Sequence, residues 1–164
     1  MRLKIIFTLL IVLALAAAAS AQTKFSGTLQ CGKPDQQQAI EVGDRPNHSF
    51  VIYQLKCTWT KSFEIAGVQS KEHVSTSFGE VSGNRSHGQD YAVGTMTNGD
   101  KYYVRGQGSA TLKEGVLESI EGKSSFVGGT GKLKGLKGKG TYTGKGAPDG
   151  TVTVEVEGEY ELPK

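Results

Sequence analysis

The sequence predicts an all-β protein, an eight-stranded antiparallel β-barrel. Three observations predict it. The 23 glycines are about twice the usual frequency, and no ten-residue window shows a helical period. Segments of alternating polarity are separated by turn residues at fairly even spacing, which is typical of a meander that closes into a barrel or folds as a sandwich. Closure would also hide the sheet edges.

The alternation places eight strands along the chain. The stretch Gly128–Gly144, where lysines alternate with glycines, suits a strand that bends sharply or lets another backbone come close, and it does not suit a helix. Asn98-Gly99 is the strongest short hairpin signal in the chain, and we expect a second turn at Gly83–Gly88. The expected strands are residues 24–31, 50–60, 69–79, 89–97, 100–112, 116–127, 133–144 and 151–162.

The longest connection runs from Gly32 to Ser49. It contains Pro34, Pro46 and three consecutive glutamines. We therefore expect either a mobile lid at the mouth of the barrel or a plain surface loop without a task.

The N-terminus has the pattern of a secretory signal peptide. A short basic segment precedes an apolar run, and Ala19-Ser20-Ala21 is a small-residue cleavage site. The alternative is a membrane anchor, but the apolar run is shorter than the roughly 20 residues that span a bilayer. We expect cleavage between Ala21 and Gln22, which removes residues 1–21, leaves residues 22–164 as one barrel domain and exports it to the periplasm or beyond.

The charge of the exported part is nearly balanced. Residues 1–21 hold two of the 19 basic residues and none of the 16 acidic ones, so 17 basic residues remain against 16 acidic ones. The last two strands suggest the same balance locally, because a hairpin turning at Pro148-Asp149 pairs Lys139 with Glu157 and Lys137 with Glu159. We therefore expect no nucleic-acid partner for the lysine run.

Cys31 and Cys57 are the two cysteines of the chain. In an exported protein the default for an even count is a disulfide. Both lie in phase with apolar residues of their strands, as a buried bridge between neighbouring strands requires. Two free thiols or a metal pair are the alternatives, and metal ranks last because further ligands at a metal-site spacing are lacking.

The run Phe126-Val-Gly-Gly-Thr-Gly-Lys-Leu-Lys-Gly-Leu-Lys-Gly138 resembles the Gly-Gly-Thr-Gly-x-Phe-x-x-x-x-Gly stretch of dirigent proteins and allene oxide cyclases, with Leu133 in place of the aromatic residue. The continuation to Glu161 is similar to bacterial secreted relatives of that superfamily. The resemblance covers about the last quarter of the chain and implies an eight-stranded barrel of the allene oxide cyclase-like or calycin-like type. It also implies an apolar molecule inside, as a substrate for cyclisation or coupling. The plant families form trimers, so a homo-oligomer is possible here. The matched residues shape the barrel, so no catalytic residue is carried over.

The interior of the barrel is the expected site. An eight-stranded barrel holds side chains or one small ligand, and an aromatic lining suits an apolar ligand, although the same side chains can simply fill the core. We expect no cofactor and no metal. The candidate lining residues are Tyr53, Trp59, Tyr91, Tyr102, Tyr103, Tyr142 and Tyr160.

Three functions fit these observations. The first is an exported barrel that binds a small apolar molecule without catalysis, or that has a structural role in the envelope. The second is an enzyme of the cyclase or dirigent kind, which a buried charged or tyrosine pair in an open cavity would favour. The third is a protein-interaction module that uses the outer face of the barrel, which a filled interior with an exposed apolar patch would favour.

Overall fold

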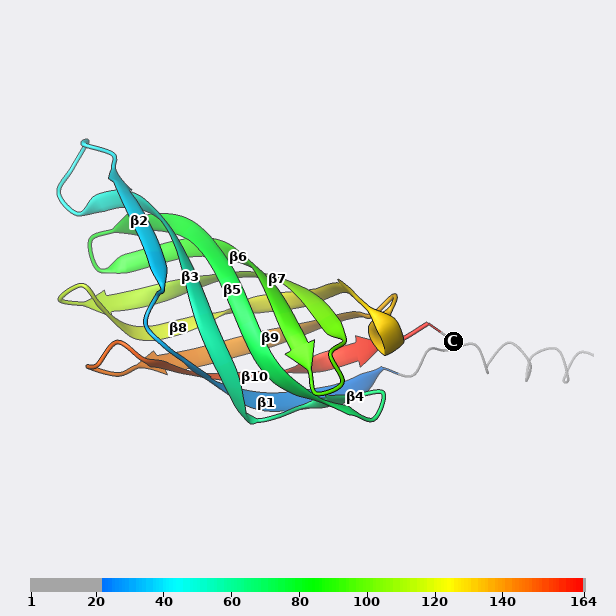
Figure 1. Cartoon of the computed structure of the whole chain (residues 1–164). Helices are drawn as coiled ribbons and strands as arrows, with labels where there is room; N and C mark the ends of the chain where they lie inside the picture. The colour runs from blue at the N-terminus through cyan, green and yellow to red at the C-terminus, as the bar shows by residue number, and fades with distance from the viewer. Residues whose placement is uncertain (1–21, 164) are drawn as a thin grey trace, which may run out of the picture.

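A closed antiparallel barrel forms the body of the molecule (Figure 1). The structure, a computed structural model, describes residues 22–163. Around the barrel, in the described chain, β3 is followed by β1, β10, β9, β8, β7, β6 and β5, and pairing of β5 with β3 closes the ring. The predicted all-β barrel of eight strands is confirmed. The barrel strands are β1 (Thr23–Cys31), β3 (His48–Lys61), β5 (Val68–Ser82), β6 (Arg85–Met96), β7 (Lys101–Lys113), β8 (Val116–Gly129), β9 (Lys137–Gly146) and β10 (Val152–Glu161).

Two short strands add to the barrel. β2 (Gln36–Glu41) pairs with the N-terminal half of β3, and β4 (Glu64–Ile65) pairs with the start of β5. The prediction that residues 32–49 form an irregular connection is therefore wrong over β2. All six β2 residues are exposed, so this strand has no buried face and no alternation of polarity that a sequence reading could detect.

The turns at the two ends of β6 test the predicted boundaries. The hairpin at Asn98-Gly99 is confirmed, with Gly99 at φ +89° and the Met96 N–H donating to the Asp100 carbonyl. The expected turn at residues 83–88 is wrong in extent, because β6 already starts at Arg85. The chain reverses within two residues, which Gly83 permits at φ +61°.

The glycine-rich segment between β8 and β9 folds inward. A 3₁₀ turn, η1 (Gly131–Leu133), occupies the start of the predicted strand 133–144, so that β9 begins only at Lys137. Leu133 and Leu136 have no exposed surface. Together with Phe63 and Ile65, they belong to an apolar cluster that also contains Tyr102 and Phe126. This segment therefore anchors its leucines in the core at one end of the barrel.

The register of β9 with β10 differs from the predicted one by two residues. Lys139 pairs with Glu159, with 3.1 Å between Nζ and Oε1, and Lys137 pairs with Glu161. The predicted partners Glu157 and Glu159 are thus wrong, but the predicted faces are right. A shift by two residues leaves each side chain on its own face of the sheet.

Cys31 and Cys57 form a disulfide, as predicted. They are direct cross-strand partners on β1 and β3, and both are buried. Leu29 and Val152 complete a second apolar cluster around the bridge. The disulfide therefore joins β1 to β3 close to the part of β3, residues 49–54, that pairs with β2.

The predicted signal peptide, residues 1–21, lies outside the described residues. Among residues 22–163, no helix has the length and apolar character that crossing a bilayer requires.

Candidate binding cavity

A cavity of about 130 Å³ lies inside the barrel, between the two apolar clusters. All eight barrel strands contribute to its wall. The volume is close to that of an engineered apolar cavity of about 150 Å³ that binds benzene. The apolar part of the wall consists of Phe25, Leu29, Leu55, Trp59, Phe63, Val104, Ile120, Phe126, Val154, Val156 and the disulfide.

The cavity exists because small residues occupy one inward-facing row of the sheet. The cross-strand partners at this level run around the barrel from β3 to β1. Three of the eight are glycine and two are serine, so little volume projects inward at this level, and the Phe25 ring lies over Gly140 and Gly158. The row is Tyr53, Ser77, Asp90, Gly106, Ser124, Gly140, Gly158 and Phe25.

Asp90 of β6 supplies the charged group of the wall. Its carboxylate accepts a hydrogen bond from Ser75 Oγ at 3.3 Å, and Ser75 Oγ lies 3.3 Å from Ser77 Oγ. The carboxylate lies over Gly106, where a Cβ would come within 2.0 Å of Oδ1. Burial raises the pKa of Asp90, and the hydrogen bond from Ser75 partly opposes that rise.

Two tyrosines share this part of the cavity with Asp90. Burial raises the pKa of Tyr53 and of Tyr142, and the nearby charge of Asp90 adds to both effects. The Tyr142 side chain lies over Gly108 and Gly122, which are cross-strand partners on β7 and β8. Both phenols therefore stay protonated and can donate a hydrogen bond to a ligand.

A hydrogen-bonded chain of three side chains lies at the other side of the cavity. Trp59 Nε1 donates to the Tyr102 hydroxyl at 3.1 Å, and that hydroxyl lies 3.3 Å from His73 Nδ1. Burial lowers the pKa of His73 to about 4, so its imidazole is neutral near pH 7. Tyr102 can therefore donate to His73 while it accepts from Trp59, which holds the indole in place.

Four of the predicted lining residues lie in the wall of the cavity, and the others do not. Tyr53, Trp59, Tyr102 and Tyr142 line the cavity. Tyr91 is 43% exposed and stacks on Tyr103 at 6.4 Å between ring centroids, so both lie on the outer face and their prediction as lining residues is wrong. Tyr160 is half-buried and packs against the apolar cluster beside Phe25 without reaching the cavity.

The sequence reading missed the polar residues of the wall, Asp90, His73, Ser75 and Ser77. A signal was present for Asp90, because it shares its strand face with Ala92, Gly94 and Met96, all of which are buried. Its position in the alternation of β6, on the same face as these small and apolar residues, therefore indicates that Asp90 points inward. The prediction instead chose the neighbouring Tyr91, because tyrosine is often found in protein interiors.

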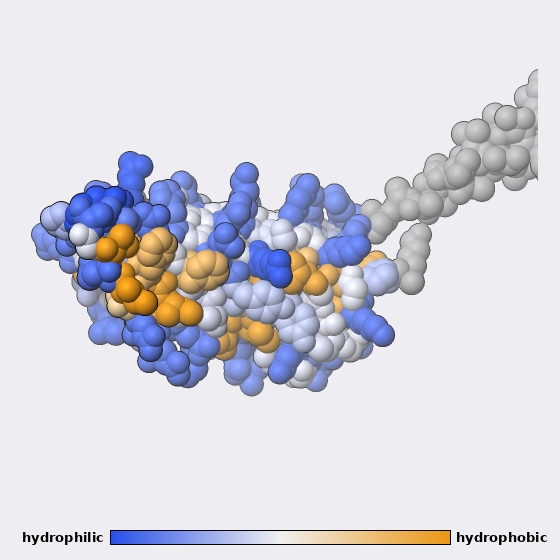
Figure 2. Space-filling view, turned by 90° about the horizontal axis from the view of Figure 1, so that it is seen from above, coloured by the Kyte–Doolittle hydropathy of each residue, from blue (hydrophilic) through white to orange (hydrophobic). Residues whose placement is uncertain are grey.

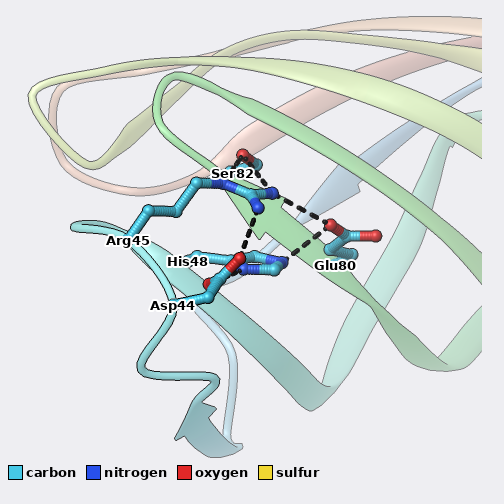
Figure 3. Close-up of polar contacts among 5 residues, drawn as sticks. All are labelled: Asp44, Arg45, His48, Glu80 and Ser82. Atoms are coloured by element: carbon cyan, nitrogen blue, oxygen red, sulfur yellow. Dashed lines mark hydrogen bonds and ion pairs between the residues drawn. The ribbon is translucent and has the colours of Figure 1, made fainter.

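A second polar cluster ties the β2–β3 turn to β5 outside the cavity (Figure 3). His48 is 7% exposed. Its Nδ1 contacts the Asp44 carboxylate and its Nε2 lies 2.8 Å from Glu80 Oε1. Arg45 pairs with Asp44 at 2.6 Å and bonds to Ser82 Oγ. The hydrogen bond to Asp44 is the main reason that the pKa of His48 is raised. Because both ring nitrogens face carboxylates, the cluster favours the imidazolium.

An apolar patch lies on the outer surface at the same end of the barrel, visible at one end of the molecule in Figure 2. Ile40 of β2 pairs with Phe50 of β3, and Ile52 of β3 pairs with Phe78 of β5. Each of these four side chains is at least half exposed. A protein-interaction module was expected to combine an exposed apolar patch with a filled interior. The patch is present, but the interior contains a cavity.

The fold and the cavity define this protein as a small closed β-barrel with a mainly apolar internal cavity that contains one acidic group. No protein-family model matches the chain, and no curated protein matches it. Among solved structures, the chain is similar to a pterocarpan synthase dirigent protein, with a TM-score of 0.47 and 11% sequence identity over 87% of this chain and 90% of that one. The strand order and the pairing of β5 with β3 define the closed barrel.

Proposed function

We propose that this protein is an exported barrel that binds a small, largely apolar molecule in the cavity between its two apolar clusters. The observation that carries the proposal is the row of small inward-facing residues, beside which a cavity of about 130 Å³ lies inside the barrel. Leaving such a cavity costs stability, because its wall lacks packing partners. A ligand that fills it restores those contacts.

The polarity of the wall indicates how the ligand is oriented. Aromatic and aliphatic side chains form most of the surface, and Asp90, Tyr53 and Tyr142 gather on one part of it. Pockets of this kind bind an apolar body by burial and select its orientation through a few polar groups. The ligand would therefore carry one hydrogen-bonding group.

Export is part of the proposal. It is supported by the signal-like pattern of residues 1–21 and by the disulfide between Cys31 and Cys57, which persists in oxidising compartments.

Mass spectrometry of the natively purified protein tests the proposal, with retention of a small apolar molecule as the expected result. Titration with benzyl alcohol provides a second reading, since Trp59 is the only tryptophan of the chain and lines the cavity. A cavity-filling variant, Ser124→Leu, should abolish the fluorescence change, and Ser125→Leu on the exposed face of the same strand should preserve it. If the native protein retains nothing and no ligand raises its Tm, the proposal is overturned.

A second candidate function is proton transfer on the bound molecule, as in an enzyme of the cyclase kind. The observation that favours it is Asp90, whose pKa burial raises, in the same cavity as two protonated tyrosines. A carboxyl group with a raised pKa is suited to general acid–base work. If the retained molecule gains carbon-bound deuterium from D₂O in the native protein but not in Asp90→Asn, this function is supported; equal labelling in both refutes it.

A further inference from the structure

The charge inside the cavity is unbalanced. Of the described residues that line it, Asp90 is the only carboxylate, and no cation faces it. Lys139 reaches the rim, but its ammonium is 3.1 Å from Glu159 on the outer face and its side chain is 75% exposed. His73 is uncharged near neutral pH because burial lowers its pKa to about 4. The carboxylate therefore has hydroxyl groups around it and no positive partner.

An unpaired carboxylate in an apolar cavity is costly unless something compensates it. Desolvation penalises the charged form, and one serine hydrogen bond at 3.3 Å replaces only part of the lost hydration. A ligand cation can supply both the missing charge and hydrogen-bond donors. Charge-assisted hydrogen bonds of this type are roughly twice as strong as neutral ones.

The surroundings of Asp90 also suit a cation. Tyr53 and Tyr142 lie near it in the wall, and aromatic faces attract ammonium groups. Beyond them the cavity turns apolar, with Phe25, Val104 and Phe126 in the wall. The cavity therefore has an acidic end at Asp90 and an apolar wall elsewhere.

We propose that the cavity selects small organic amines with an apolar, ring-sized body, and that the ligand ammonium binds the Asp90 carboxylate. This inference rests on the proposed binding function and names its ligand class. The alternative is a neutral ligand whose oxygen accepts a hydrogen bond from protonated Asp90.

The two ligand classes respond to pH in opposite ways. Burial raises the pKa of Asp90, so lowering the pH protonates it and removes the partner of an ammonium group. Amine binding should therefore tighten as the pH rises through the pKa of Asp90, while binding of a neutral acceptor should weaken. The other titratable groups facing Asp90 are Tyr53 of β3 and Tyr142 of β9, and burial keeps both protonated over this range.

Benzylamine and benzyl alcohol are nearly isosteric, and they separate the alternatives. We would measure both affinities by calorimetry and Trp59 fluorescence for the native protein, for Asp90→Asn and for Asp149→Asn, a control in the exposed β9–β10 turn. We expect the native protein and Asp149→Asn to prefer the amine by at least about tenfold and Asp90→Asn to lose that preference.

Each other outcome is decisive. Equal affinity for both ligands, or an amine preference that survives in Asp90→Asn, overturns the inference and leaves the binding function intact. If neither ligand binds and the purified protein retains nothing, both proposals fall. A preference for benzyl alcohol that strengthens in acid overturns the amine proposal in favour of the protonated-carboxyl alternative.

Discussion

The Tyr142 side chain lies directly over Gly122 of the neighbouring strand. A Cβ at position 122 would come within 2.3 Å of the Tyr142 hydroxyl and within 2.4 Å of the Gln107 carbonyl oxygen. The tyrosine therefore occupies the space that a side chain at position 122 would take. The phenol lines the cavity near Asp90.

Gly122→Ala should destabilise the barrel by about 1–3 kcal/mol, as other overpacking substitutions do. The Gln107 contact involves backbone, so it cannot be relieved by a rotamer change. The measurement is the free energy of unfolding from urea titration. Gly32→Ala is the control, because its Cβ would meet nothing closer than 3.9 Å. Equal stability of the two variants would refute this account of Gly122.

Asp90→Asn should raise the stability of the ligand-free protein at neutral pH. Burial raises the pKa of Asp90 in the folded state, so ionisation costs stability above the ordinary pKa of an aspartate and costs nothing well below it. The advantage of the variant should therefore shrink as the pH falls. Differential scanning calorimetry of both proteins between pH 3 and pH 8, as an approximate range, measures it.

Asp149→Asn provides a control of opposite sign for that experiment. The Asp149 carboxylate accepts hydrogen bonds from the Thr151 N–H at 3.0 Å and its hydroxyl at 2.7 Å. The backbone bond from Thr151 is the main reason that the pKa of Asp149 is lowered. Its stabilisation is present above the ordinary pKa and is lost as the pH falls through the lowered one. Parallel pH profiles for the two variants would contradict both assignments.

Replacing Cys31 and Cys57 with serine should lower the free energy of unfolding by about 3 kcal/mol on the chain-entropy model. The bridge closes a loop between residues separated by 26 positions. Urea titration of the oxidised protein, the reduced protein and the double variant measures this loss. The reductant should leave the double variant unchanged, and a native protein equally stable with and without reductant would contradict the prediction.

Raising the pH should loosen the β2–β3 turn. The raised pKa of His48 means that its contribution is complete below its ordinary pKa of about 6.5 and is lost as the pH rises through the raised value. Hydrogen exchange over residues 42–48, corrected for the intrinsic pH dependence, should accelerate across that range. The β6–β7 turn at residues 97–100 contains no histidine and should show no such step. A step that persists in His48→Gln would exclude His48 as its cause.

The sequence determines the strand faces well. Alternation places Tyr53, Leu55, Cys57 and Trp59 on one side of β3, and all four line the cavity. The predicted pairing of β9 with β10 was two residues out of register, yet its faces were right, because an even shift preserves a period of two. Tyr91 shows where the prediction failed. Its residue type suggested an interior position, but the buried residues of β6 lie on the opposite face of the strand.

By itself, then, the sequence determined an all-β chain, its turn at Asn98-Gly99 and the two-faced strands, and it favoured a disulfide between its two cysteines. Only the tertiary structure decided the rest: the added strand β2, the inward fold at Leu133, and the cavity with Asp90 in its wall. The physical reason is one of range. Alternation is a property of neighbouring residues, whereas an empty row around a barrel depends on the register of eight strands at once, and each register is set by contacts between distant segments.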